Sequence, residues 1–216
     1  MVINVSVDQL TLNQGENPKS EKARVILDGA LQVFTTQGYS AASMDRIAAA
    51  ANVSKSTLYS YFQDKEGLFL ALVEELTAAR RREVFNLLSQ SDLQAPPQVV
   101  LRQIANVMLD NAEKNQPLLT LMRLLLGESE RFPKLVKIFT AEIKKPMLDQ
   151  LALYFASQTQ LNLPDPVVAA RIFSGSIVHY LIQQNLMGGH EVMPLERDRM
   201  VDGLVDLLMA RDKSVQ

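Results

Sequence analysis

The sequence predicts an all-α protein. No segment alternates polar and apolar residues with a period of two over a useful length, so we expect no sheet. Apolar residues instead recur at intervals of three and four, and breaks rich in proline or glycine separate these runs at 91–97, 162–166 and 188–189. With 216 residues, 47% of them hydrophobic, the chain can form one large or two small domains around a substantial core.

The first expected helix covers about 20–37. One face carries apolar residues at helical spacing, and Gly38 follows as a cap that tolerates a positive φ. Residues 1–17 contain many polar residues and show little periodicity, so we interpret them as a flexible N-terminal arm. The apolar face of the first helix consists of Ile26, Leu27, Ala30, Leu31 and Phe34.

Two short helices are expected over 43–62. Ser43 is a good N-cap for the first, and Asp45 lies in its first turn, where the helix dipole favours negative charge. Asn52 suits a tight turn that needs a positive φ, and Ser54 can cap the second helix. This pattern indicates a helix-turn-helix, and an ordinary αα-hairpin is the alternative. The apolar residues that would bring the two helices together are Ile47, Ala48, Ala51, Val53 and Leu58.

A long helix over 64–89 is expected next, with Asp64 as its N-cap, and it would join the two parts of the chain. Its apolar residues include Leu68, Phe69 and Leu72. The later periodic segments predict helices over 97–114, 117–129, 133–157 (kinked by Pro146), 166–187 and 194–211.

The helix-turn-helix and its flanks resemble a known family. Residues 20–70 are similar to the N-terminal domain of the TetR family of bacterial transcriptional regulators, and residues 116–155 resemble the C-terminal domain of its AefR-like branch. The sequence departs from the family at Asn52, where Gly is more frequent, and at Ser56, where Gly or Ala is more frequent. The matching residues are Ala30 to Phe34, Gly38-Tyr39, Ser43 to Ile47, Val53 to Tyr59, Tyr61-Phe62, Lys65-Glu66 and Leu68-Phe69.

The resemblance implies a domain organisation. Residues 18–66 would form a three-helix helix-turn-helix DNA-binding domain, and residues 67–216 a larger helical domain for effector binding and dimerisation. It also implies a function: a transcriptional repressor that binds a palindromic operator as a dimer and is released by a small hydrophobic effector. Two alternatives stay open, which are a DNA-binding regulator controlled by a protein partner and a transcriptional activator.

The second helix of the motif carries the candidate DNA contacts. Lys55 can donate to guanine or to phosphate, and Ser56 and Thr57 can bond to base edges. The family resemblance implies that three further residues, Ser43, Tyr59 and Lys65, hold backbone phosphates. Residues 18–65 hold six bases against four acids, a net charge of only +2, so we expect weak non-specific binding and a need for two domains acting together.

The last two expected helices, 166–187 and 194–211, are the candidate dimer interface. The first places small residues among large apolar ones, and the second repeats apolar residues at i, i+3, i+4 and i+7. The resemblance implies that these helices pair with their symmetry mates in a four-helix bundle. The second motif helices of the two chains, the recognition helices, would then lie about one DNA turn apart. The alternative is that both faces only close the core of one chain.

An effector pocket is expected between the middle helices. Methionine adapts to apolar ligands of varied shape, and most methionines of this chain lie beyond residue 100. His179 and Tyr180 are the best polar candidates, although a core histidine is the simpler explanation of the first. The full candidate set is Met108, Met122, Arg123, Phe139, Phe173, His179 and Tyr180, and for each of them plain core packing is the alternative.

Composition excludes several other functions. The chain has no Cys and only two His, so disulfides are excluded and no transition-metal centre is expected. We find no nucleophile–base pair, no phosphate-binding loop, and no apolar run or leader that predicts a membrane span or signal peptide. We therefore expect a cytoplasmic protein that is not an enzyme and needs no cofactor.

Overall fold

The structure is a computed structural model that describes residues 18–89, 95–114 and 116–210. Every regular element within these ranges is helical, which confirms the predicted all-α class. The expected arm over 1–17 lies outside the described residues. The elements are α1 (Pro18–Ala41), α2 (Met44–Ala50), α3 (Lys55–Tyr61), α4 (Lys65–Ser89), α5 (Pro97–Lys114), α6 (Gln116–Gly127), α7 (Pro133–Phe139), α8 (Lys145–Ser157), α9 (Pro166–Leu181), α10 (Gly189–Val192) and α11 (Arg197–Met209).

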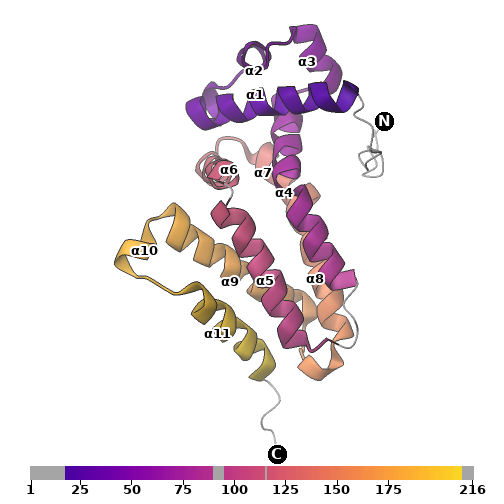
Figure 1. The fold of residues 1–216 in the computed structure, drawn as a ribbon, viewed down its shortest axis with the longest axis vertical. Helices are drawn as coiled ribbons and strands as arrows, with labels where there is room; N and C mark the ends of the chain where they lie inside the picture. The colour runs from indigo at the N-terminus through magenta and orange to yellow at the C-terminus, as the bar shows by residue number, and fades with distance from the viewer. Residues whose placement is uncertain (1–17, 90–94, 115, 211–216) are drawn as a thin grey trace, which may run out of the picture.

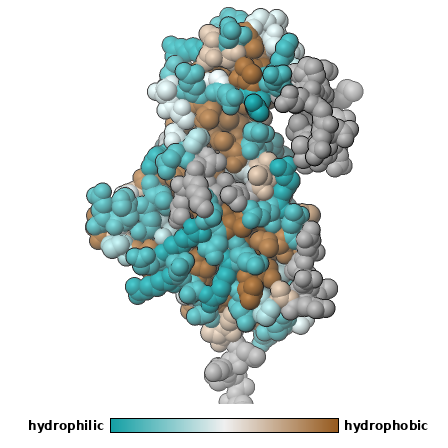
Figure 2. Space-filling view, in the orientation of Figure 1, coloured by the Kyte–Doolittle hydropathy of each residue, from teal (hydrophilic) through white to brown (hydrophobic). Residues whose placement is uncertain are grey.

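The helices form an upper and a lower part that α4 connects (Figure 1). The upper part consists of α1, α2 and α3, and the lower part of α5, α8, α9, α10 and α11. Helices α6 and α7 lie between them, and α6 contacts α1. Polar residues cover much of the surface in this view, with apolar patches exposed on both parts (Figure 2).

Two buried clusters hold these parts together. One centres on α1 to α3 and the first half of α4, where Phe34, Tyr39 and Phe69 pack with ring centroids 5.3–5.6 Å apart. Leu121 of α6 and Leu135 of α7 belong to the same cluster. The other cluster is built from the end of α4 and from α5, α8, α9 and α11, with Leu119 of α6 and Leu161. The core around the helix-turn-helix therefore continues into helices that lie far from it in the sequence.

Two predicted helices are interrupted by π-helical turns. The expected helix 133–157 is divided by a π turn over Thr140–Lys144, just before Pro146. Proline has no N–H to donate and its ring clashes with the carbonyl four residues earlier, so the backbone shifts to a wider turn there. A second π turn, Ile182–Leu186, ends the helix that begins at Pro166.

The helix boundaries also differ in detail. The first helix breaks at Gly38 (φ 79°), as predicted, but one more helical turn follows and ends at Ala41. The last helix begins at Arg197 rather than at 194, with Glu196 at its N-cap, and the short α10 lies in the expected break before it.

Candidate DNA-binding surface and effector cavity

Local capping fixes the two helices of the motif. The Ser43 side chain accepts a hydrogen bond from the Arg46 N–H at 3.3 Å, and the Ser54 side chain accepts one from the Thr57 N–H at 3.1 Å. Asn52 adopts a φ of 52°, so the turn has the positive φ that its position predicts. These caps and this turn set the direction in which α3 projects.

Close packing against α1 fixes the position of the motif. A Cβ atom on Gly29 of α1 would lie 2.7 Å from the Ala51 nitrogen, closer than van der Waals contact allows. Leu58 of α3 is fully buried in the same core. The backbone of α1 thus lies directly against the turn, and glycine is needed for this approach.

Helix α3 presents the candidate DNA contacts together. Lys55, Ser56 and Tyr59 are exposed, and Thr57 is half-buried. The hydroxyls of Ser56 and Thr57 both hydrogen-bond to Ser54 Oγ, at 2.9 and 2.8 Å, so the helix cap orients them. Tyr59 is 50% exposed, which leaves its ring free to contact another molecule.

Lys55 is paired within the chain. Its Nζ lies 2.6 Å from Asp45 Oδ2, and both side chains are more than half exposed. Asp45 belongs to α2, so the pair links the first turns of the two motif helices. Sequence reasoning did not find this contact, because it depends on the crossing of α2 and α3. When α3 contacts DNA, the Asp45 carboxylate would compete with phosphate for the Lys55 ammonium.

Lys65 has a structural role at the start of α4. Its ammonium donates to the carbonyls of Tyr39 (2.9 Å) and Ala42 (3.0 Å), and it lies 4.4 Å from the centre of the Tyr39 ring. Burial lowers the pKa of the Lys65 ammonium, and the charges of Glu66 and Glu128 partly offset this. These contacts of the Lys65 ammonium connect α4 to the end of α1. A phosphate bound by Lys65 would share the ammonium with these two carbonyls.

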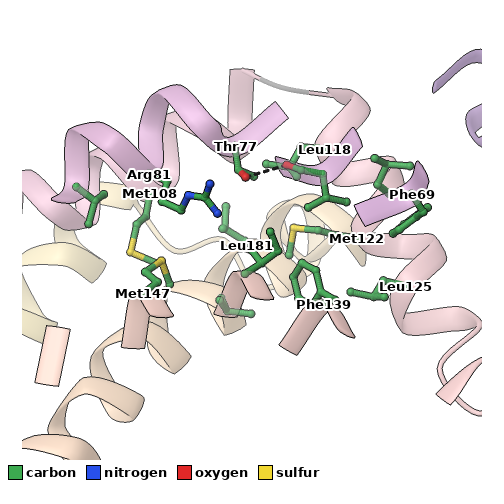
Figure 3. Close-up of a pocket in the computed structure, with 15 residues that line it drawn as sticks. Phe69, Thr77, Arg81, Met108, Leu118, Met122, Leu125, Phe139, Met147 and Leu181 are labelled. Atoms are coloured by element: carbon green, nitrogen blue, oxygen red, sulfur yellow. Dashed lines mark hydrogen bonds between the residues drawn. The ribbon is translucent and has the colours of Figure 1, made fainter. Parts of the chain in front are cut away.

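An apolar cavity of about 170 Å³ lies where α4, α5 and α6 meet the segment from α7 to α9 (Figure 3). Helix α4 contributes five of its residues at helical spacing, including Thr77 and Arg81. The described residues that line it are Phe69, Val73, Thr77, Arg81, Val84, Met108, Leu118, Leu121, Met122, Leu125, Phe139, Ile143, Met147, Val178 and Leu181.

Three of the seven candidate pocket residues line this cavity: Met108, Met122 and Phe139. Sequence reasoning missed the α4 residues because it treated this helix as a connection. The repeat of Phe69, Val73, Thr77, Arg81 and Val84, at steps of four and three, was the signal that could have found them.

The other four candidates do not line the cavity. His179 is exposed, because α9 turns Val178 and Leu181 toward the cavity while His179 lies on another face of the helix. Tyr180 and Phe173 are buried in the lower cluster, where the Phe173 ring packs edge-on against Phe155. Arg123 is exposed and donates to the Asn185 carbonyl at 3.1 Å.

The described residues lack two other kinds of feature. They contain no group of three or more His, Cys, Asp or Glu side chains arranged to hold a metal ion. No helix within the described ranges is long and apolar enough to cross a membrane.

Comparison with known proteins identifies the family. Residues 26–72 match the model of bacterial regulatory proteins of the tetR family, and residues 99–211, more than half of the chain, match the model of the AefR-like transcriptional repressor C-terminal domain. The chain belongs to the TetR family. TetR-family proteins are transcriptional regulators rather than enzymes, which agrees with the function expected from the sequence.

Individual TetR-family relatives agree with this assignment. The chain is 26% identical over 198 residues to the HTH-type transcriptional regulator YuxN of Bacillus subtilis, a match that covers 88% of the chain and 62% of YuxN. The chain thus spans less than two thirds of that relative, and only 26–30% of the next two curated relatives.

Solved structures also match nearly the whole chain, and two of them are 26% identical to it. One comes from Mesorhizobium loti and is assigned to the same family; it has a TM-score of 0.71 and 26% identity, covering 91% of this chain and 98% of its own. The other is the flavonoid-responsive regulator FrrA, with a TM-score of 0.63 and 26% identity, covering 89% of this chain and 97% of its own.

Proposed function

We propose that this TetR-family protein is a transcriptional repressor that binds a palindromic operator as a homodimer and releases it when a small hydrophobic effector fills the cavity. One observation carries the proposal: α4 holds the helix-turn-helix at one end and forms a wall of the apolar cavity further along. A ligand that favours one position of α4 changes the spacing of the recognition helices, and a tenfold change in operator affinity requires only about 1.4 kcal/mol.

The DNA-binding role is assigned to α3 and its neighbours. Ser56 and Thr57 read base edges in the major groove, Lys55 donates to guanine or to phosphate, and Tyr59 contacts a phosphate. Ser43 and Lys65 add phosphate contacts from the starts of α2 and α4. Residues 18–66 form the DNA-binding domain in this proposal, and 67–216 the effector-binding and dimerisation domain. Operator binding places the protein in the cytoplasm.

The dimer is assigned to α9 and α11. Val168, Ile172, Gly175 and His179 follow one another on α9 at steps of four, three and four, and all four are exposed. Leu207 of α11 is 74% exposed. A stripe with this spacing, in which exposed apolar residues are followed by a small residue and by His179, supports pairing with a symmetry mate, as in a four-helix bundle.

Effector release is supported by the cavity and by one relative. The lining is almost entirely apolar and includes three methionines, Met108, Met122 and Met147, whose side chains adapt to a guest. FrrA, which shares the fold at 26% identity, is described as responsive to flavonoids. A small organic molecule is thus the class of effector that this family member is best suited to bind.

The test is selection of bound fragments from a random duplex DNA pool at two salt concentrations. We expect a palindrome with half-sites about one helical turn apart. Lys55→Ala should lose the enrichment, while Lys137→Ala, which removes an exposed charge from α7, should keep it. The proposal is contradicted if the unmodified protein and Lys137→Ala enrich a single asymmetric site, or if they enrich no sequence.

The direction of regulation is tested separately. The selected site is placed over the promoter of a reporter gene, and the protein is expressed from a second promoter. A repressor lowers reporter output, and a fall that depends on Lys55 supports the proposal. A rise in output supports the activator alternative.

A further inference from the structure

The cavity holds one charged side chain. Among its lining residues only Thr77 and Arg81 carry polar side-chain groups, and both project from α4 one turn apart (Figure 3). The Thr77 hydroxyl donates to the Val73 carbonyl of its own helix at 2.8 Å. Arg81 is therefore the principal polar donor that faces an otherwise apolar space.

The protein leaves the hydrogen-bond donors of the Arg81 guanidinium available to a ligand. Within the part of the chain that the structure describes, it makes no hydrogen bond or ion pair, although its side chain is only partly exposed. Its charge acts on Glu74, two turns earlier on α4, whose pKa is raised mainly by burial and also by Glu142. A guanidinium offers five N–H donors and keeps its charge at any physiological pH, so it favours a ligand that brings an anion.

The rest of the cavity selects for an apolar body. Figure 3 shows the Arg81 guanidinium pointing into the space between Met108, Met147 and Leu181, with Phe139 and Met122 further along. A ligand that places an anionic group on the guanidinium would lie with its remaining atoms against these side chains. A carboxylate matches the fork of donors in two parallel hydrogen bonds, which a single hydroxyl cannot do.

We propose that the effector is a small apolar monocarboxylate whose carboxylate binds Arg81. This inference rests on the proposed function, because it names the chemistry of the effector for the same cavity. It adds a direct physical link, since the charged group binds the helix that carries the DNA-binding domain. Phe69 and Val73 of the same helix line the cavity and also belong to the upper buried cluster.

The experiment compares acids with the matching alcohols on the full chain. Octanoate, decanoate and 3-phenylpropanoate are each titrated by calorimetry below any micelle concentration, beside octanol, decanol and 3-phenylpropanol. We expect at least one acid to bind the unmodified protein about tenfold more tightly than its alcohol. Arg81→Gln should abolish this difference and leave alcohol binding unchanged.

The controls separate charge from folding. Arg82→Gln removes the neighbouring, exposed guanidinium and should bind like the unmodified protein. Alcohol binding by Arg81→Gln reports that its cavity is intact. The proposal is overturned if no acid binds more tightly than its alcohol, or if Arg81→Gln keeps the preference for the acid.

Failure of the proposed function gives a different result. If an acid binds through Arg81 but leaves operator binding unchanged, the ligand class stands and the release mechanism is wrong. If the operator is bound and no acid is preferred, the DNA-binding function stands and the ligand class is wrong.

Discussion

The ion pair between Asp45 and Lys55 limits what α3 can offer to DNA. Both side chains are exposed, 58% and 64%, so the pair contributes little to folding. The pair instead weakens DNA binding, because the Asp45 carboxylate neutralises the Lys55 ammonium and repels phosphates.

We therefore expect Asp45→Asn to raise the affinity for random-sequence DNA several-fold. It should also steepen the slope of log K against log salt by about one, as for one additional phosphate contact. Fluorescence anisotropy with a labelled duplex over a range of salt concentrations measures both. Asp198→Asn, an equal charge change on α11, is the control. An unchanged salt slope for Asp45→Asn would show that the released ammonium of Lys55 does not contact a phosphate.

Glu74 gives the stability of the fold a pH dependence. Burial is the main cause that raises the pKa of its carboxyl above 4.5; Arg81 lowers it and Glu142 raises it. A raised pKa means that the ionised form opposes folding. This cost is absent below the unfolded-state pKa, develops as the pH rises through the folded-state pKa, and is then constant.

Glu74→Gln should therefore raise the midpoint of thermal unfolding at pH 7.5 and have much less effect near pH 4.5. The measurement is thermal unfolding of both proteins at the two pH values. Glu75→Gln changes the exposed neighbouring carboxylate and is the control. An equal shift for Glu74→Gln at both pH values would mean that ionisation of this group does not cause it.

At the scale of elements, the contact of α1 with the helix-turn-helix depends on Gly29. A methyl group there would lie 2.7 Å from the Ala51 nitrogen and 2.8 Å from its Cβ, so the helices must separate. Alanine is the better helix former by up to about 1 kcal/mol, but overpacking costs about 1–3 kcal/mol.

Gly29→Ala should therefore destabilise the protein and weaken operator binding. Chemical denaturation gives the change in the free energy of unfolding. Gly127→Ala, at the end of α6 where the added Cβ meets no atom within 4 Å beyond its chain neighbours and the backbone of its own helix, should have little effect on the stability. A wild-type unfolding midpoint for Gly29→Ala would show that α1 shifts without cost.

The sequence could predict the features that neighbouring residues determine, but not those that depend on which helices pack together. The caps at Ser43 and Ser54 and the positive φ of Asn52 follow from neighbouring residues, and the structure has them. The cavity depends on which helices surround α4, which no local pattern contains. For this reason Arg81 was missed, since a charged helical residue ordinarily faces solvent.

The pocket candidates on α9 show a related limit. The composition of α9 indicated an apolar segment. Whether one of its residues faces the cavity depends on how the helix is rotated about its axis relative to the neighbouring helices. A difference of one residue turns the side chain by about 100°. His179 is therefore exposed while Val178 lines the cavity.

At the scale of the whole molecule, one helix-turn-helix is too small and too weakly charged to bind an operator alone. Residues 18–65 have a net charge of +2, which supports only weak non-specific binding. Two linked domains gain about 10²–10⁴ in affinity through their effective concentration, provided that their spacing fits the DNA. Loss of the dimer should therefore abolish operator binding even when α3 is intact.

Ile172→Arg tests this dependence. Ile172 is 54% exposed at the centre of the α9 stripe, so a charge there costs the folded chain little but would face its symmetry mate in the proposed dimer. We expect a folded monomer by analytical ultracentrifugation, and a loss of operator affinity of at least 100-fold. Phe85→Arg, at a 49% exposed position on α4, should stay dimeric and bind DNA. If Ile172→Arg remains a dimer while Phe85→Arg dissociates, the interface includes the exposed face of α4, and occupancy of the cavity would then act on the dimer itself.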